Sequence, residues 1–127
     1  MEEYCRKRVK EGNEAYIYAG GNGKGGWGTN PTTMYTGISL SYYEGRFSMT
    51  VYESCWKVAL ILPEGSDDLN RISKETVEVI AVNMPNSMEV AGTTWQKWKL
   101  SVKELESLTG LDFFSALPQS VQDKLEK

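Results

Sequence analysis

WKVALIL, at residues 56–62, is a nearly continuous apolar run that ends at Pro63. Such a run is typical of a central strand that is buried on both faces of a sheet. A second β-prone run, VEVIAVNM, covers residues 77–84 and ends at Pro85-Asn86. We therefore expect these two segments to be strands at the centre of the fold, with Trp56 as a member of the core.

Working outward from these strands, three shorter segments also favour β-structure. Residues 15–19 form a β-prone run that ends abruptly at Gly20. Residues 38–42 and 47–51 alternate apolar and polar side chains on either side of Glu44-Gly45, which predicts a β-hairpin. The glycine-rich and asparagine-rich stretch at residues 20–33 is predicted to form a loop.

Helix signals lie at both ends of the sequence. Ser101 and Glu104 have the spacing of a capping box, which predicts a helix over residues 102–109. A helix is also predicted over residues 1–11, from an imperfect apolar stripe that a Gly-Asn pair follows. Residues 118–125 begin with proline and have amphipathic spacing, which predicts a last helix.

The order of these elements predicts an α+β fold with a largely antiparallel sheet flanked by helices, because strands and helices do not alternate as they would in a parallel sheet. Residues 63–72 are interpreted as a polar connector, and residues 93–100 as a short strand or one helical turn. The 127 residues suffice for one domain, and no repeat or linker divides them.

The amino-acid composition limits the catalytic mechanisms and the binding partners that this sequence is compatible with. The sequence contains no histidine, which excludes Ser-His-Asp and Cys-His catalysis and any histidine-ligated metal site within these residues. Fourteen basic residues against 17 acidic residues leave a net charge of −3, which argues against a broad nucleic-acid footprint.

The cysteines and the apolar runs further limit the metal sites and the membrane partners that are possible. Cys5 and Cys55 are two isolated cysteines without C-x-x-C spacing, so they cannot build a structural zinc site. They form either one disulfide or, as we favour, two free and partly buried thiols. The first residues lack the apolar core of a secretory signal, and no apolar run approaches the length of a membrane span. We therefore expect no membrane partner.

Three patterns are candidate sites that also have plainer explanations. Residues 21–26 satisfy G-x-G-x-x-G, but the residues that follow do not start a helix, which favours a loop with positive φ over a phosphate cradle. Residues 67–70 carry two aspartates and an asparagine but fail the EF-hand register, which favours a capped turn. Trp27, Trp56, Trp95 and Trp98 offer rings for base stacking, although a core or ligand-neutral role is favoured.

The predicted first helix carries a fourth candidate. Glu2 and Arg6 are four residues apart and therefore share a face. Spacing alone indicates a surface ion pair, while the functional alternative is a carboxylate near a metal hydration shell beside a guanidinium that neutralises phosphate. Arg6, Lys7, Arg8 and Lys10 fall within five positions, which indicates a solvated helix face or a local basic strip.

Five blocks of the sequence, taken in order, resemble one protein family. They are MEEYCRK at residues 1–7, YIYAGG at 16–21, CWKV at 55–58 with PEGS at 63–66, VIAVNMPN at 79–86 and LTGLDFF at 108–114. In combination they resemble the DNA/RNA non-specific endonucleases of the His-Me finger (ββα-metal) superfamily, from Met1 to about Pro118. Each block alone is a weak signal, whereas the combination is specific.

The resemblance implies cleavage of a phosphodiester bond with one magnesium ion, which polarises the phosphate and stabilises the leaving oxygen. It implies that Glu2 contacts metal-bound water and that Arg6 stabilises charge at the scissile phosphate. Arg6, Arg8 and Lys10 are the implied nucleic-acid-binding residues. The histidine of the family's Asp-Arg-Gly-His motif and its metal-holding asparagine match no residue here, and the resemblance places both upstream of Met1.

We therefore expect residues 1–127 to be the C-terminal portion of a nuclease domain, inactive in isolation and without tight magnesium binding of its own. The implied partners are DNA or RNA and the missing N-terminal half of the domain. Without that half, one flank of the sheet would stay uncovered. The alternative is a non-catalytic module that keeps the nuclease scaffold and binds nucleic acid or another protein.

Overall fold

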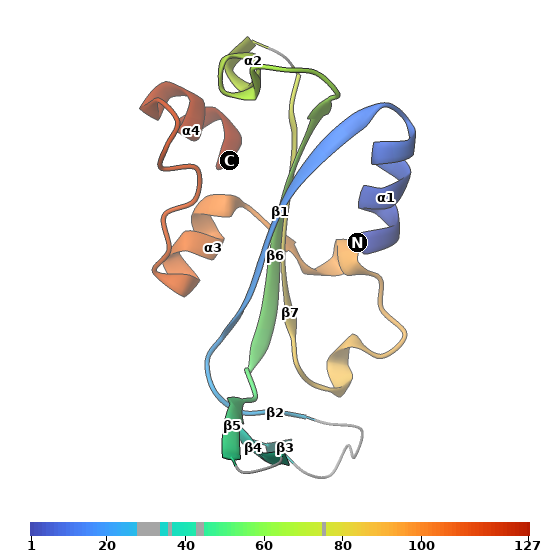
Figure 1. Cartoon of the computed structure of the whole chain (residues 1–127), viewed down its shortest axis with the longest axis vertical. Coiled ribbons are helices and arrows are strands. Elements are labelled where there is room, and N and C mark those ends of the chain that lie inside the picture. The colour runs from blue at the N-terminus through green and yellow to red at the C-terminus, as the bar shows by residue number, and fades with distance from the viewer. Residues whose placement is uncertain (28–33, 36, 43–44, 75) are drawn as a thin grey trace.

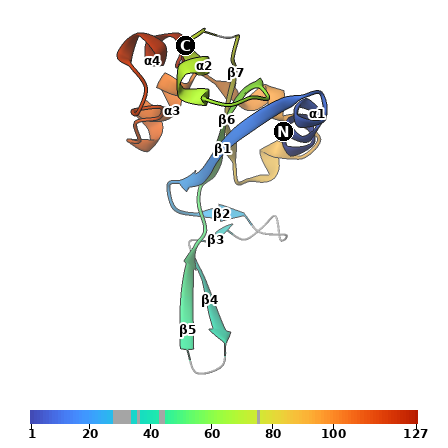
Figure 2. The same cartoon turned by 45° about the horizontal axis from the view of Figure 1, so that its top comes forward.

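The computed structural model describes residues 1–27, 34–35, 37–42, 45–74 and 76–127. Its helices are α1 (Glu2–Lys10), α2 (Asp68–Lys74), α3 (Val102–Thr109) and α4 (Gln119–Leu125), with the 3-10 turns η1 (Met88–Val90) and η2 (Trp95–Trp98). Its strands are β1 (Asn13–Asn22), β2 (Gly26–Trp27), β3 (Met34–Tyr35), β4 (Gly37–Tyr42), β5 (Gly45–Thr50), β6 (Ser54–Pro63), β7 (Glu78–Pro85) and β8 (Lys99–Leu100). Figures 1 and 2 show a body built on the long strands, with β4 and β5 extending beyond it at one end.

The main sheet has four antiparallel strands in the order β1-β6-β7-β8. β6 lies inside it and pairs with β1 over ten residues, from Asn13 opposite Pro63 to Asn22 opposite Ser54. This arrangement confirms the predicted α+β class and the central position of WKVALIL. β1 closes the sheet on one side, and within the described ranges its one strand partner is β6.

Side-chain alternation along β6 and β7 separates two cores, one on each face of the sheet. On the face that α1 covers, called the α1 face, the buried residues are Cys5, Ala59, Ile61, Ile80 and Val82. On the other face, called the α3 face, they are Trp56, Val58, Leu60, Leu62, Ile72, Ala81, Val102, Leu105, Phe113, Leu117, Val121 and Leu125. Figure 1 shows α1 on one side of the sheet and α3 and α4 on the other.

The small strands test two of the sequence predictions. β4 and β5 pair antiparallel from Gly37 opposite Thr50 to Tyr42 opposite Gly45, which confirms the hairpin; its predicted turn lies partly outside the described residues. The predicted loop at residues 20–33 is wrong at its start, because β1 continues to Asn22 by pairing with the first residues of β6. Residues 28–33 lie outside the described residues.

The polar connector predicted at residues 63–72 contains helix α2, which the sequence prediction missed. The backbone carbonyl of Asp67 accepts from the amides of Asn70 and Arg71, and Asp67 itself has φ +64°. Arg71 Nη1 donates to Glu14 Oε1 and Asp68 Oδ1, both at 2.9 Å, and thereby joins α2 to β1. The turn predicted at residues 67–70 is confirmed, with the Asp67 carboxylate accepting from the Asn70 side chain at 2.7 Å, although the turn opens a helix.

The remaining helix predictions are confirmed. The side chain of Ser101 accepts from the amide of Glu104, the Glu104 carboxylate accepts from the amide of Ser101, and α3 ends at Gly110 with φ +71°. Residues 93–100 contain both predicted alternatives, the 3-10 turn η2 and the short strand β8.

Both cysteines are free thiols, as we favoured, but the prediction that both are partly buried is wrong, because Cys5 is buried and Cys55 is exposed. Burial raises the pKa of the Cys5 thiol above its usual value. None of the helices in the described ranges combines the length and the apolar composition that crossing a membrane requires.

Candidate functional site

Helix α1 carries the two candidate catalytic residues, and its own sequence explains how it is placed. Cys5 is buried in the core of the α1 face, and Tyr4 packs on an aromatic ring of η2 with ring centroids 5.5 Å apart. Glu2, Arg6 and Lys10 follow one another at four-residue spacing and are all exposed. The helix therefore presents one carboxylate and two cations along its outer side.

Glu2 pairs with a residue of the central strand rather than with Arg6. Lys57 Nζ donates to Glu2 Oε1 at 2.7 Å, and the Lys57 side chain is 21% exposed against 70% for Glu2. The hydrogen bond from Lys57, followed by the charge of Lys57, lowers the pKa of Glu2 below its usual value, and Arg6 contributes less. Glu2 is therefore ionised at neutral pH, and the surface ion pair predicted between Glu2 and Arg6 is wrong.

Arg6 and Lys10 are the two basic residues of α1 that form no ion pair with any residue that the structure describes. They border a hollow of about 500 Å³ on the α1 face, whose other lining residues are Glu2, Cys5, Val9, Ala15 and Ile17. Because neither cation must first leave a carboxylate, both are available to an anionic ligand.

Lys7 and Arg8, the other two members of the predicted basic strip, are both paired with carboxylates. Lys7 Nζ lies 3.7 Å from Glu11 Oε1, and Arg8 is held in a network. Its Nη1 donates to Glu11 Oε2 at 2.9 Å and its Nε donates to Glu78 Oε2 at 3.1 Å. Tyr4 Oη donates to the other oxygen of Glu78 at 2.6 Å. The bond to Glu11 raises the pKa of the Arg8 guanidinium, with Glu78 adding to it. The predicted strip thus contains two available cations, Arg6 and Lys10, and two that are paired with carboxylates, Lys7 and Arg8; its role in binding nucleic acid stays a prediction.

The surroundings of Glu2 do not complete a magnesium site by themselves. Glu2 and Glu3 border a second hollow of about 500 Å³, but neighbouring residues on a helix do not face each other. Magnesium takes near-octahedral oxygen ligands, and the carboxylate of Glu2 is already neutralised by an ammonium group. The described residues contain no group of three or more side chains suited to holding a metal ion.

Two residues that organise this site, Lys57 and Glu78, were not predicted from the sequence. Lys57 is the single charge inside the apolar run WKVALIL, and a charged side chain in a buried strand needs a partner. That irregularity could have singled out Lys57. No local pattern distinguishes Glu78, because its partners on α1 are 70 and 74 residues away in the sequence.

For the glycine-rich stretch at residues 21–26, the structure supports a loop with positive φ rather than a phosphate cradle. Gly23 and Gly25 have φ +69° and +107°, which confirms the prediction of positive φ. A strand, β2, begins at Gly26, the last glycine of the motif, where a phosphate cradle requires the start of a helix, so that alternative is wrong.

The tryptophans differ in their surroundings. Trp56 is buried and meets Phe113 edge to face with centroids 5.3 Å apart, which confirms it as a core residue. Trp95 packs on α1, whereas Trp98 donates to Thr93 Oγ1 at 3.0 Å. The side chain of Trp27 lies outside the described residues.

Comparison with known proteins places these observations in context. Residues 1–120 match the protein family described as "DNA/RNA non-specific endonuclease". A protein named "Nuclease" from Nostoc sp. (strain PCC 7120) is 38% identical over 126 residues, which are 99% of this chain. The chain spans 39% of the length of that relative.

Proposed function

The chain belongs to the DNA/RNA non-specific endonuclease family, and on this premise we propose that it forms the C-terminal part of a magnesium-dependent domain that hydrolyses phosphodiester bonds in DNA or RNA. The observation that carries the proposal is the exposed row of Glu2, Arg6 and Lys10 on α1, within the segment that matches the family. Two available cations next to an ionised carboxylate suit the approach of a polyanion to a centre that must also hold water.

Each member of the row has a distinct chemical role in this proposal. The Arg6 guanidinium would donate to two oxygens of the scissile phosphate and offset the charge that builds up there. Lys10, one turn further along α1, would neutralise a neighbouring phosphate and set the position of the strand. Glu2, kept ionised by Lys57, would accept a hydrogen bond from water at the reaction centre.

Magnesium, on which enzymes of this family depend, is assigned to the complete domain rather than to these residues alone. The chain also has no histidine to act as general base, and loss of a general base typically costs about 10² to 10⁴ in rate. We therefore expect the isolated 127 residues to lack appreciable nuclease activity.

A second candidate function is a non-catalytic module that keeps the scaffold and binds nucleic acid through α1. The available cations Arg6 and Lys10 favour it, because phosphate binding needs neither a histidine nor a metal ion.

The test of the nuclease proposal is a chimera in which this chain replaces the matching segment of the Nostoc nuclease. The chimera should nick supercoiled plasmid DNA in the presence of magnesium, whereas the isolated chain should not. Arg6→Ala and Glu2→Gln should each lower the rate by about 10² or more, as loss of one charge-stabilising group does in other enzymes.

Matched controls lie on the same helix. Glu3→Gln and Lys7→Ala remove the same charges at exposed positions next to Glu2 and Arg6, and they should leave the rate nearly unchanged. A chimera that folds, as judged by circular dichroism, but cuts nothing would contradict the proposal. Equal losses in the variants and the controls would remove Glu2 and Arg6 from the site.

A salt titration separates the second candidate from the first. If the isolated chain is a binding module, its affinity for a fluorescent DNA should fall steeply as ionic strength rises, and Lys10→Ala should lower the slope. Absence of binding at low salt would exclude nucleic-acid binding by the isolated chain.

A further inference from the structure

The carboxylate of Glu2 is held by a strand residue and not by the arginine one turn further along its own helix. Glu2 and Arg6 are four residues apart with the acid nearer the N-terminus, which is the orientation that favours an ion pair on a helix. Among the described residues, however, no ion pair joins them. Lys57 Nζ on β6 instead donates to Glu2 Oε1 at 2.7 Å. The helix sequence therefore favours one pair, and the tertiary structure forms another.

Lys57 is placed by the strand that carries it. Its cross-strand neighbours, Ala19 on β1 and Val82 on β7, are uncharged, and its side chain is only 21% exposed. A mostly buried ammonium group needs a partner, and Glu2 is the partner that the described residues supply. Because the strand already restricts the Lys57 side chain, this pair costs less side-chain entropy than a pair between two exposed side chains of α1.

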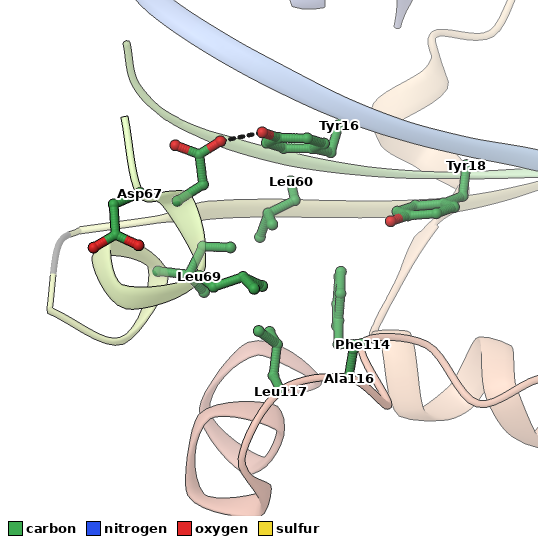
Figure 3. Close-up of a pocket in the computed structure, with 10 residues that line it drawn as sticks. Tyr16, Tyr18, Leu60, Asp67, Leu69, Phe114, Ala116 and Leu117 are labelled. Carbon is green, nitrogen blue, oxygen red and sulfur yellow. Dashed lines mark hydrogen bonds between the residues drawn. The ribbon is translucent and has the colours of Figure 1, made fainter. Parts of the chain in front are cut away.

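Helix α2 shows what happens when the strand residue is neutral. Tyr16 of β1 donates a hydrogen bond to the carboxylate of Asp68, the first residue of α2 (Figure 3). Here the arginine of the same helix pairs with the carboxylate as well, because Arg71 Nη1 donates to the other oxygen of Asp68 at 2.9 Å. A hydroxyl group occupies one oxygen and leaves the negative charge in place, whereas an ammonium group neutralises it. The charge of the strand residue therefore accounts for the different pairing of the two helix arginines.

We propose that Lys57 is a positioning residue that holds Glu2 away from Arg6 and thereby leaves the Arg6 guanidinium free for phosphate. The inference rests on the proposed function, in which Arg6 meets the scissile phosphate. Lys57 takes one oxygen of Glu2, and the second oxygen, which has no donor among the described residues, stays open to a hydrogen bond from water. One ammonium group thus sets the direction of the carboxylate and keeps a neighbouring cation unpaired.

The first test follows the pKa of Glu2 in the 127-residue chain, by NMR titration of its side-chain carboxyl group. In the wild type Lys57 is the main cause of the lowered pKa of Glu2, so Arg6→Ala should raise that pKa only slightly. Lys57→Gln keeps a hydrogen-bond donor and removes the charge, so Arg6 should become the partner of Glu2. Arg6→Ala should then raise the pKa of Glu2 more in the Lys57→Gln background than in the wild type. Equal shifts in the two backgrounds would overturn the inference.

Two variants serve as controls for this titration. Lys57→Arg keeps a cation on the strand, so Arg6→Ala should retain its small effect. Lys7→Gln removes the same charge at an exposed position of α1, and it should not increase the effect of Arg6→Ala. Circular dichroism checks that each variant folds. Lys57→Met, which keeps an apolar stem of similar length, replaces Lys57→Gln if the glutamine variant does not fold.

The second test measures plasmid nicking by the chimera with the Nostoc nuclease. Lys57→Gln should raise KM about two- to threefold, because an exposed ion pair at this helix spacing would engage Arg6 for only part of the time. It should lower kcat about tenfold or more, because Glu2 is no longer held in place. Lys57→Arg should retain most of the wild-type values. A Lys57→Gln chimera that cuts as fast as the wild-type chimera would overturn the positioning role.

The two tests separate this inference from the proposed function. The NMR titration needs neither catalysis nor a bound nucleic acid. A change of partner in the titration, together with a chimera that cuts nothing in any variant, would reject the proposed function alone. An active chimera in which Lys57→Gln has no effect would reject the role of Lys57 alone.

Discussion

β1 and β6 are neighbouring strands of equal length in one antiparallel ladder, yet they have very different surroundings. Residues 58–62 of β6 are all less than 5% exposed, whereas residues 16–18 of β1 are 40–50% exposed. β6 has a strand on each edge and helices over both faces, while β1 has one strand neighbour among the described residues. Apolar composition thus led to burial only where neighbours are present.

The difference in burial indicates how much each strand contributes to the stability of the protein. β6 supplies the stability of the fold, because its side chains complete the cores on both faces of the sheet. β1 leaves Tyr16, Ile17 and Tyr18 half exposed, and we expect these side chains to stabilise the chain less than those of β6. The following predictions test this division, from the largest expected effect to the smallest.

The largest contrast is expected between two isoleucines on the α1 face. Ile61→Ala should lower the free energy of unfolding by about 2 to 5 kcal/mol, because Ile61 is 1% exposed and the change leaves a cavity. Ile17→Ala should cost about 1 kcal/mol or less, because that side chain is half exposed. Urea denaturation followed by circular dichroism measures both. Similar losses of unfolding free energy at the two positions would contradict the difference in packing between β6 and β1.

Gly20→Ala should show where β1 stops being an open strand and becomes part of the core. An added Cβ would lie 2.5 Å from Cζ2 of Trp56, so the indole must shift, at a cost of about 1 to 3 kcal/mol. Ala19→Ser adds one atom at the exposed neighbouring position and serves as the control. Urea denaturation gives the cost, and tryptophan fluorescence should change only for Gly20→Ala. An unchanged spectrum and stability would mean that the two strands are less closely packed there.

Ser101→Ala tests whether α3, which covers β6 and has no counterpart over the middle of β1, contributes to the stability of that region. Loss of the cap should cost about 1 kcal/mol at neutral pH. Hydrogen bonds from the Ser101 amide and side chain lower the pKa of Glu104, so this stabilisation is present above the usual pKa of 4.5 and is lost as pH falls through the lowered value. The difference between wild type and variant should therefore shrink in acid.

Urea denaturation at neutral and acid pH measures that change. Ser107→Ala, at an exposed serine inside α3, is the control and should show a smaller effect without the same pH dependence. An effect of Ser101→Ala that stays constant across this range would mean that the hydrogen bond from the Ser101 hydroxyl to the Glu104 carboxylate adds nothing to the cap.

The smallest effect on stability is expected at the edge itself. Tyr18→Lys should change the free energy of unfolding of the isolated chain by no more than about 0.5 kcal/mol, because the ring is half exposed. It should raise the protein concentration at which the chain stays monomeric in light scattering, because a charge on an edge strand opposes strand addition. Leu108→Lys adds the same charge away from β1. Equal gains in solubility from the two variants would assign the effect to net charge.

Elements with strong local signals could be predicted from the sequence. The apolar run of β6 and the capping box of α3 each indicate their secondary structure within a few consecutive residues. α2 was missed because its apolar positions give no helical stripe: Leu69 is exposed and Ile72 is buried. The end of β1 was missed because its glycines favour a loop locally and join the sheet only through the ladder with β6.

The candidate site shows the same limit. Glu2 and Arg6 were found through motifs that resemble a family, and their assignment stays a prediction. Lys57, which holds Glu2, is 55 residues away in the sequence, and no local pattern relates the two positions. The division of the basic strip into available and engaged cations also depends on a distant carboxylate, that of Glu78.

The sequence by itself determined the fold class, the central strand, the hairpin and the capped helix, because each depends on residues that are close together in the chain. Only the tertiary structure decided which apolar strand is covered, which partner holds Glu2 and which cations remain available on α1. Those outcomes depend on the order and register of strands that are tens of residues apart. β1 is the clearest case, since Tyr16, Ile17 and Tyr18 form an apolar run in the sequence and are nevertheless half exposed at the edge of the sheet.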